Sequence, residues 1–276
     1  MKLVRWGAAG AERPGLIGDD GRLRDLSAHC GDITPEMLAP DRLARLAALA
    51  PTTLPLVTGS PRLGPPVAGI RSLIGIGLNY RDHAAEAGMA LPAEPVVFSK
   101  HPGALAGPDD RLVLPRHSSK VDWEVELAVI IGSRASCVSE VEALSHIAGY
   151  AVVNDISARD WQLEGTGQWI KGKSYPGFAP LGPWLVTADA VPDPQNLRLW
   201  LEIDGKRMQD GSTADMVFGV ATVVSAVSRF MALEPGDVIC TGTPAGVGLG
   251  RGVFLKPGDV MTLGVEGLGT QRIEVM

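Results

Sequence analysis

The chain has 276 residues and a formal net charge of −6, and its composition is ordinary for a soluble enzyme. This length accommodates one large domain, or a small domain beside a larger one. The negative charge argues against nucleic acid or an acidic membrane surface as a partner. No apolar run approaches the roughly 18 residues of a membrane span, no signal-peptide pattern is present, and the three cysteines are widely spaced, so we expect a cytoplasmic protein with reduced thiols.

The first part of the chain has the pattern of a small separate unit. Strands are predicted at 1–6 and 14–18 and a short helix at 40–50, and a proline-rich connector follows. We therefore expect a small N-terminal domain over residues 1–65 and a catalytic domain over 66–276.

From residue 70 onward, short β-like runs alternate with glycine and proline turns, and one clear helix is predicted at 217–231. The pattern predicts a β-rich α+β fold and not a regular series of βαβ units. The predicted strands are 72–77, 96–99, 121–131, 149–156, 184–187, 197–203, 237–240 and 259–265.

The segment after the first of these strands contains His83 and Glu86. In a helix the two residues are neighbours, three positions apart. A carboxylate beside an imidazole raises its basicity and fixes its tautomer, as a general base requires. Histidine–glutamate pairs are also common on protein surfaces, so this pair alone does not establish a catalytic role.

The predicted strand 121–131 contains two carboxylates, Glu124 and Glu126, within an otherwise apolar run. Successive strand side chains alternate between faces, so the two glutamates share one face, with Cβ atoms roughly 7 Å apart. Like charges at the edge of a core repel each other unless a cation or hydrogen-bond donor lies between them. The alternative is a solvated strand face, where this pattern is common.

A third carboxylate, Asp155, ends the next hydrophobic run. Between the two runs, Ser139 provides a helix cap signal and apolar residues follow at helical spacing. Strand, helix and strand can then bring Asp155 beside the glutamates. Three carboxylates without a nearby cysteine or paired histidine favour a hard cation, Mg²⁺ or Mn²⁺ before Zn²⁺.

Further polar residues follow Asp155. Arg159 and Gln162 offer donors one helical turn away, and Lys173 is predicted in a glycine- and proline-rich loop, where it could stabilise an oxyanion or simply face solvent. The glycine-rich loop 241–248 offers backbone amides and Thr243 to a carboxylate, unless it is only a tight turn.

In this order, the motifs make the chain resemble the fumarylacetoacetate hydrolase family over roughly three quarters of its length. Each motif is common by itself, whereas the ordered set is specific. The motifs are Gly77-Leu78-Asn79-Tyr80 leading to His83 and Glu86, Phe98-Ser99-Lys100, Glu124 with Glu126, Asn154-Asp155 with Arg159 and Gln162, Lys173 with Pro180-Leu181-Gly182-Pro183, and Thr241-Gly242-Thr243-Pro244.

The resemblance implies a mixed β-roll catalytic domain and a divalent cation, Mg²⁺ or Mn²⁺. It also implies that residues 80–88 form a lid that closes over the metal. The implied site residues are Glu124, Glu126 and Asp155 as metal ligands, His83, Glu86 and Lys173 as catalytic residues, and Tyr80, Lys100, Arg159, Gln162 and Thr243 as substrate-binding residues.

Within the family, the chain is most similar to the branch that cleaves 2,4-diketo-3-deoxy sugar acids, such as the L-rhamnonate or L-fuconate derivatives. One departure concerns the loop after Lys173. Relatives commonly have an aspartate and a threonine where this chain has Pro176 and Gly177, which leaves the substrate preference and the position of Lys173 open.

The function implied by the resemblance is metal-dependent hydrolysis of a C–C bond in a 2,4-diketo acid, which yields pyruvate and a carboxylic acid. His83, polarised by Glu86, is expected to deprotonate the attacking water, and Lys173 to stabilise the oxyanion. Oxaloacetate decarboxylation and hydroxymuconate isomerisation stay open as alternatives, as does a non-catalytic protein that kept the fold. We expect a homodimer or larger homo-oligomer that binds a small-molecule substrate.

Overall fold

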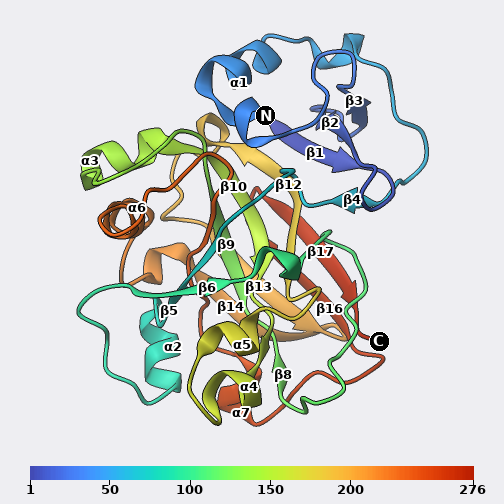
Figure 1. Ribbon diagram of the computed structural model, residues 1–276. Helices are drawn as coiled ribbons and strands as arrows, with labels where there is room; N and C mark the ends of the chain where they lie inside the picture. The colour runs from blue at the N-terminus through green and yellow to red at the C-terminus, as the bar shows by residue number, and fades with distance from the viewer.

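The computed structural model describes residues 1–276 and has a β-rich α+β architecture with short helices, which confirms the expected fold class (Figure 1). Its centre is an 11-stranded mixed sheet, in which β15 pairs with β5 and β12 with β7 in parallel and the other pairs are antiparallel. Its main path runs through β3 (Leu23–Asp25), β2 (Arg13–Ile17), β1 (Lys2–Trp6), β12 (Ala179–Thr187), β10 (Ile147–Asn154), β9 (Val125–Ile131), β15 (Val238–Cys240), β5 (Leu73–Gly77) and β6 (Val96–Lys100), with β4 (Leu63–Gly64) on β1 and β7 (Leu105–Ala106) on β12.

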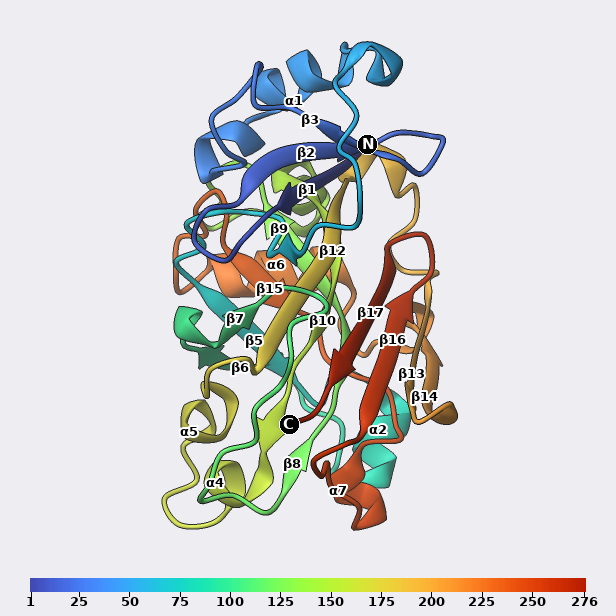
Figure 2. The same cartoon turned by 90° about the vertical axis from the view of Figure 1, so that its right-hand side faces the viewer.

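A second, four-stranded antiparallel sheet lies beside the large one (Figure 2). It is attached by the buried side chain of Gln271, whose amide donates to backbone oxygens of Val152, Pro180 and Gly182 at 3.0–3.1 Å. The strands of this sheet are β14 (Lys206–Ser212), β13 (Arg198–Ile203), β16 (Val260–Val265) and β17 (Gly269–Glu274), and a separate pair is formed by β8 (Val121–Asp122) and β11 (Ser157–Ala158).

Strand β9 lies at the middle of the large sheet, and all seven of its residues are buried. Such a run of apolar residues is typical of a strand covered on both faces. The single strand predicted over 121–131 is interrupted, because the Asp122 carboxylate accepts the Trp123 amide at 2.7 Å and the Asn154 side chain accepts the Glu124 amide at 3.0 Å. The break separates Glu124 from the regular strand that contains Glu126.

The helices are short, and α6 is the longest of them. Its valines at helical spacing are buried, so tertiary packing outweighs the modest helix propensity of β-branched residues. The helix is shorter than the predicted 217–231, because the amides of Val217 and Phe218 donate to Asn79 instead. The α-helices are α1 (Pro40–Ala47), α2 (Arg81–Glu86), α3 (Glu140–Ala143), α4 (Arg159–Leu163), α5 (Trp169–Lys173), α6 (Val220–Ser228) and α7 (Gly248–Arg251).

The N-terminal strands, blue in Figure 1, extend the large sheet. Strand β1 pairs with β12, and the Met1 ammonium group donates to the Thr187 hydroxyl at 2.6 Å. The unit over residues 1–65 is thus bonded to the rest of the chain through backbone pairing, and the domain boundary at 65 stays a prediction. None of the helices is long and apolar enough to cross a membrane.

Candidate active site

Three buried carboxylates meet where β9 begins and β10 ends. Oxygens of Glu124, Glu126 and Asp155 all lie within 4.8 Å of one another. The antiparallel register places Val153 opposite Glu126, and the Asp155 amide donates to the Glu124 carbonyl at 2.9 Å. The pairing of these two strands therefore brings the three predicted ligands together.

Two of the three carboxylates are neutralised by buried cations. Lys173 Nζ lies 2.7 Å from Glu124 and 2.8 Å from Asp155, and Arg159 lies 2.6 Å from Glu124. Lys100 forms a further buried ion pair with Asp155. Burial alone would raise the pKa of Glu124, but Lys173 and Arg159 hold it well below its usual range.

Glu126 has no such partner, and its carboxylate accepts a single hydrogen bond from the Gly242 amide at 2.8 Å. Burial raises its pKa well above the usual range, and the negative charges of Asp155 and Glu124 raise it further. A buried carboxylate without a counterion is costly. An oxygen-rich pocket with this unbalanced charge fits a hard divalent cation held by Glu124, Glu126 and Asp155.

Lys173 reaches the carboxylates from the last turn of α5, whereas the sequence predicted a loop at this position. Helix α5 packs closely against α4 because Gly172 has no side chain. A Cβ atom on Gly172 would lie 2.5 Å from the Ala158 carbonyl oxygen. The glycine thus permits the close approach that brings the neighbouring lysine into the core.

The glycine-rich loop 241–248 holds carboxylates through its backbone amides. Gly242 donates to Glu126, Ala245 donates to Asp82 at 3.2 Å, and Gly246 donates to Glu86 at 3.0 Å. The backbone amides thus donate hydrogen bonds to carboxylates, as the sequence indicated they could. The carboxylates that accept these bonds are side chains of the protein itself. The loop therefore fixes both a predicted metal ligand and helix α2.

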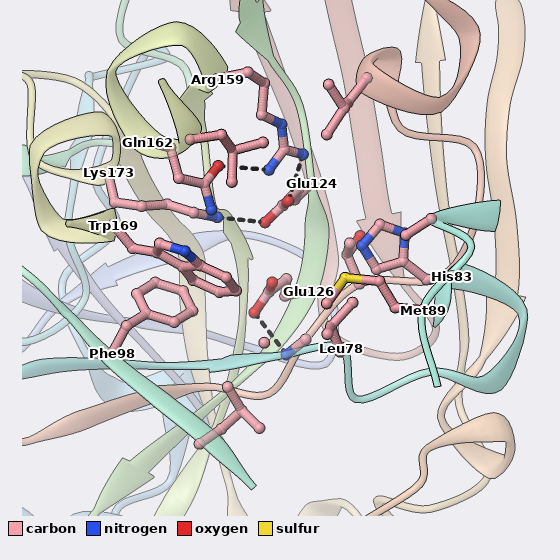
Figure 3. Close-up of a pocket in the computed structure, with 17 residues that line it drawn as sticks. Leu78, His83, Met89, Phe98, Glu124, Glu126, Arg159, Gln162, Trp169 and Lys173 are labelled. Carbon is pink, nitrogen blue, oxygen red and sulfur yellow. Dashed lines mark hydrogen bonds and ion pairs between the residues drawn. The ribbon is translucent and has the colours of Figure 1, made fainter. Parts of the chain in front are cut away.

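Helix α2 places His83 opposite the carboxylates (Figure 3). Its Nδ1 lies 3.3 Å from Glu86 Oε2, in the predicted helical arrangement. A proton on Nδ1 faces Glu86 and leaves Nε2 free to accept another proton. Because Gly246 holds Glu86 in turn, the imidazole is oriented by a chain of contacts that starts in the backbone.

Arg159 is held by a residue that the sequence reasoning missed. The buried Asp122 carboxylate accepts from Arg159 Nε at 2.8 Å and from the amides of Gly248 and Leu249 at 2.6 and 2.9 Å. Arg159 also donates to Gln162 Oε1 at 2.9 Å. Asp122 precedes Glu124 by two residues, so the same alternation that indicated the glutamates could have indicated it.

Most of the predicted site residues surround one cavity of about 100 Å³. The predicted residues that line it are His83, Glu124, Glu126, Arg159, Gln162, Lys173 and Thr243, and they are joined by Ile76, Gly77, Leu78, Ala87, Met89, Phe98, Leu163, Trp169, Gly242 and Leu249.

The other predicted residues lie just outside this cavity. Tyr80 and Lys100 are fully buried and are not among the residues that line it, and their substrate-binding role stays a prediction. Lys100 instead bonds Asp155 and the Ile156 carbonyl oxygen. The Thr243 hydroxyl lines the cavity but donates to the Val125 carbonyl oxygen and accepts from Gln209, a second residue that the sequence did not indicate.

Comparison with known proteins identifies the family to which the sequence is similar. Residues 72–276 match the family model described as fumarylacetoacetate (FAA) hydrolase, C-terminal. A Burkholderia lata protein, named only as a presumed hydrolase, is 57% identical over 274 residues that cover 98% of this chain and 97% of that protein.

Two solved structures are similar over the whole chain. Maleylpyruvate hydrolase from Sphingobium sp. SYK-6, in complex with manganese and pyruvate, is 29% identical with a TM-score of 0.82 over 100% of this chain and 99% of that one. A 2-hydroxyhepta-2,4-diene-1,7-dioate isomerase from Mycobacterium marinum is 33% identical with a TM-score of 0.75, over 100% and 98% of the two chains.

Proposed function

Because the chain belongs to the fumarylacetoacetate hydrolase family, we propose that it is a divalent-metal-dependent hydrolase of 2,4-diketo acids, which are acylpyruvates. It cleaves the C3–C4 bond and releases pyruvate and a carboxylic acid. The observation that carries the proposal is one small cavity lined by Glu124 and Glu126, which cluster with Asp155, and by His83, which Glu86 orients from behind. Binding of manganese and pyruvate by the similar maleylpyruvate hydrolase supports it.

The carboxylates Glu124, Glu126 and Asp155 would hold Mg²⁺ or Mn²⁺, which when bound supplies Lewis-acid stabilisation of negative charge on the pyruvate part of the substrate. His83 takes a proton from water, and the hydroxide oxygen attacks the C4 carbonyl carbon. Glu86 keeps the imidazole oriented and stabilises its protonated form.

Donors at the carboxylate end of the cavity would stabilise the oxyanion that forms at C4. Lys173 is fixed there by its two ion pairs and Gln162 by its bond to Arg159, so neither needs to reorganise as charge develops. When the C3–C4 bond breaks, its electron pair passes to C3, which takes up a proton and becomes the methyl group of pyruvate. The hydroxide oxygen stays with the acyl group as part of the second product.

Isomerisation is the second candidate, and the similarity to the Mycobacterium marinum isomerase is the observation that favours it. Isomerisation and oxaloacetate decarboxylation need no hydrolytic water. The oriented His83–Glu86 pair favours hydrolysis because it can activate the water that this reaction requires, although an isomerisation could use the same pair to move a proton; we therefore place hydrolysis first. The sugar-acid substrate and the homo-oligomeric state expected from the sequence stay predictions.

The test is a comparison of the three reactions with one protein preparation supplied with Mg²⁺ or Mn²⁺. Pyruvate release from acylpyruvates, decarboxylation of oxaloacetate and isomerisation of a hydroxymuconate are each followed. We expect kcat/KM for an acylpyruvate to exceed the values for both other substrates by at least about tenfold. A faster isomerisation or decarboxylation would assign the site to that reaction instead.

A further inference from the structure

Apolar side chains form much of the lining of the cavity, an apolar wall on both sides of Glu126 (Figure 3). On one side the rings of Phe98 and Trp169 pack together with their centroids 5.3 Å apart and their planes at 59°. Leu78 and Met89 line the other side, beside His83. Leu163 and Leu249 complete the apolar lining, and both are partly exposed to solvent.

The aromatic pair is built into the sheet by two glycines of β5. A Cβ atom on Gly75 would lie 2.1 Å from the Phe98 ring, and one on Gly77 would lie 2.6 Å from the Trp169 ring. Real side chains do not approach so closely, so both rings need these glycines in order to contact the strand. The apolar wall is therefore a fixed part of the cavity and not a chance grouping of mobile side chains.

The cations that line the cavity are engaged in ion pairs, and one of them, Lys173, lies beside the apolar wall with its Nζ 5.0 Å from the centroid of the Phe98 ring. Of the lining residues, only Lys173 and Arg159 are permanently charged cations, and both are ion-paired with Glu124. His83 faces Glu86, and the hydroxyl group of Thr243 is used within the protein. A second carboxylate on the substrate would have to compete with Glu124 and Asp155 for Lys173, and a buried unpaired charge is strongly disfavoured.

We propose that the acyl group of the substrate is short, uncharged and apolar, lying between Phe98 and Trp169 on one side and Leu78 and Met89 on the other. This inference rests on the proposed acylpyruvate hydrolysis and specifies its substrate class. The whole cavity has a volume of only about 100 Å³, and the same space must also receive the pyruvate part of the substrate, which favours a short acyl chain. The preference differs from that expected for a sugar acid or for a dicarboxylate.

The test uses three acylpyruvates with short tails. Propanoylpyruvate has an apolar tail, lactoylpyruvate adds one hydroxyl group and corresponds to the rhamnonate derivative, and succinylpyruvate carries a second carboxylate. We expect kcat/KM to fall in this order, with at least about tenfold between the first and the last. Binding of the same three compounds to His83→Ala, in which turnover is slowed by about 10²-fold or more, should follow the same order when measured by titration calorimetry.

A cation placed at the cavity should change this preference. Met89 is 53% exposed, so Met89→Lys introduces a charge of similar length without disturbing the core. We expect about a fivefold gain in kcat/KM for succinylpyruvate, the size of a surface ion pair. Met89→Gln is the uncharged control, and Val141→Lys, on the 94% exposed position of α3, is the charge control. Neither control variant should show a higher kcat/KM for succinylpyruvate.

The outcomes separate the two proposals. Absence of pyruvate release from all three compounds contradicts the proposed function, and the calorimetric order then still tests the tail preference. Preferred turnover or binding of lactoylpyruvate or succinylpyruvate by the unmodified protein overturns the inference and leaves acylpyruvate hydrolysis in place.

Discussion

At the scale of single residues, two glutamates in one motif have opposite electrostatic environments. Glu124 is ion-paired with Lys173 and Arg159, and these cations hold its pKa low against the effect of burial. Glu126 meets only a backbone amide, so burial and its acidic neighbours raise its pKa. The charge that a bound cation would compensate is therefore mainly that of Glu126, and replacing Glu126 breaks no ion pair.

His83 is the residue whose removal should separate proton transfer from metal binding. We expect His83→Ala to lower kcat for acylpyruvate hydrolysis by about 10²-fold or more, because a positioned base contributes that much. The affinity for the divalent metal should be retained, because His83 contacts Glu86 and is not among the three predicted metal ligands, which are the clustered carboxylates. Steady-state kinetics and calorimetric metal titration of the same preparation check both parts. Turnover within a few-fold of the unmodified protein would contradict the base assignment.

The sequence was sufficient to find residues whose partners are close in the chain. Glu124 and Glu126 follow strand alternation, and His83 and Glu86 follow helical spacing, so local periodicity indicated both pairs. Lys100 and Asp122 act through ion pairs with Asp155 and Arg159, 55 and 37 positions away. Strand alternation could have indicated Asp122 as a residue, but the partners of both side chains depend on how strands and helices pack, and periodicity does not report them.

At the scale of elements, the two glycines of β5 show how the lack of a side chain can shape the cavity. The rings of Phe98 and Trp169 pack against Gly75 and Gly77, where no side chain stands in their way. The strand therefore positions the apolar wall in addition to pairing within the sheet. The left-handed backbone of Leu78, with φ of 54°, follows directly and turns the chain toward α2. Non-glycine residues with this conformation are strained and cluster at functional sites.

A side chain at Gly75 should therefore be poorly tolerated. We expect Gly75→Ala to lower the free energy of unfolding by about 1–3 kcal/mol, because the Phe98 ring must move away from the new methyl group. Gly31→Ala is the matched control, since a Cβ atom there would meet nothing within 4 Å and the change should stay within about 0.5 kcal/mol. Urea unfolding measures both. Equal stability of the two variants would show that the ring is not confined by the strand.

The elements themselves were predictable where the apolar pattern was long and regular. The central strands and the helix around α6 were found, although the helix is shorter because Asn79 takes two amides at its start. Strands β14 and β17 were missed. Their sequences contain many polar and charged residues, such as Arg207 and Asp210 in β14 and Arg272 in β17, and their exposed faces show no continuous apolar run.

At the scale of the whole molecule, the cavity is assembled from segments far apart in the chain. The carboxylates come from the centre of the large sheet, the histidine from α2, the lysine from α5, and the amides from the loop after β15. The β9–β10 connection is local enough to be inferred from sequence order, and this is why the three carboxylates could be grouped. The packing of α5 against β6 is not local, so the apolar wall and its consequence for substrate choice required the structure.

The central claim is that Glu124, Glu126 and Asp155 hold the divalent cation on which pyruvate release depends. Its most direct test is a titration of Mn²⁺ into metal-free protein with an acylpyruvate present, in which bound metal and released pyruvate are followed together. We expect release to rise in proportion to occupancy, to saturate at about one ion per chain, and to be lost together with metal binding in Glu126→Gln. Full release by the metal-free protein, or unchanged metal occupancy in Glu126→Gln, would contradict the claim.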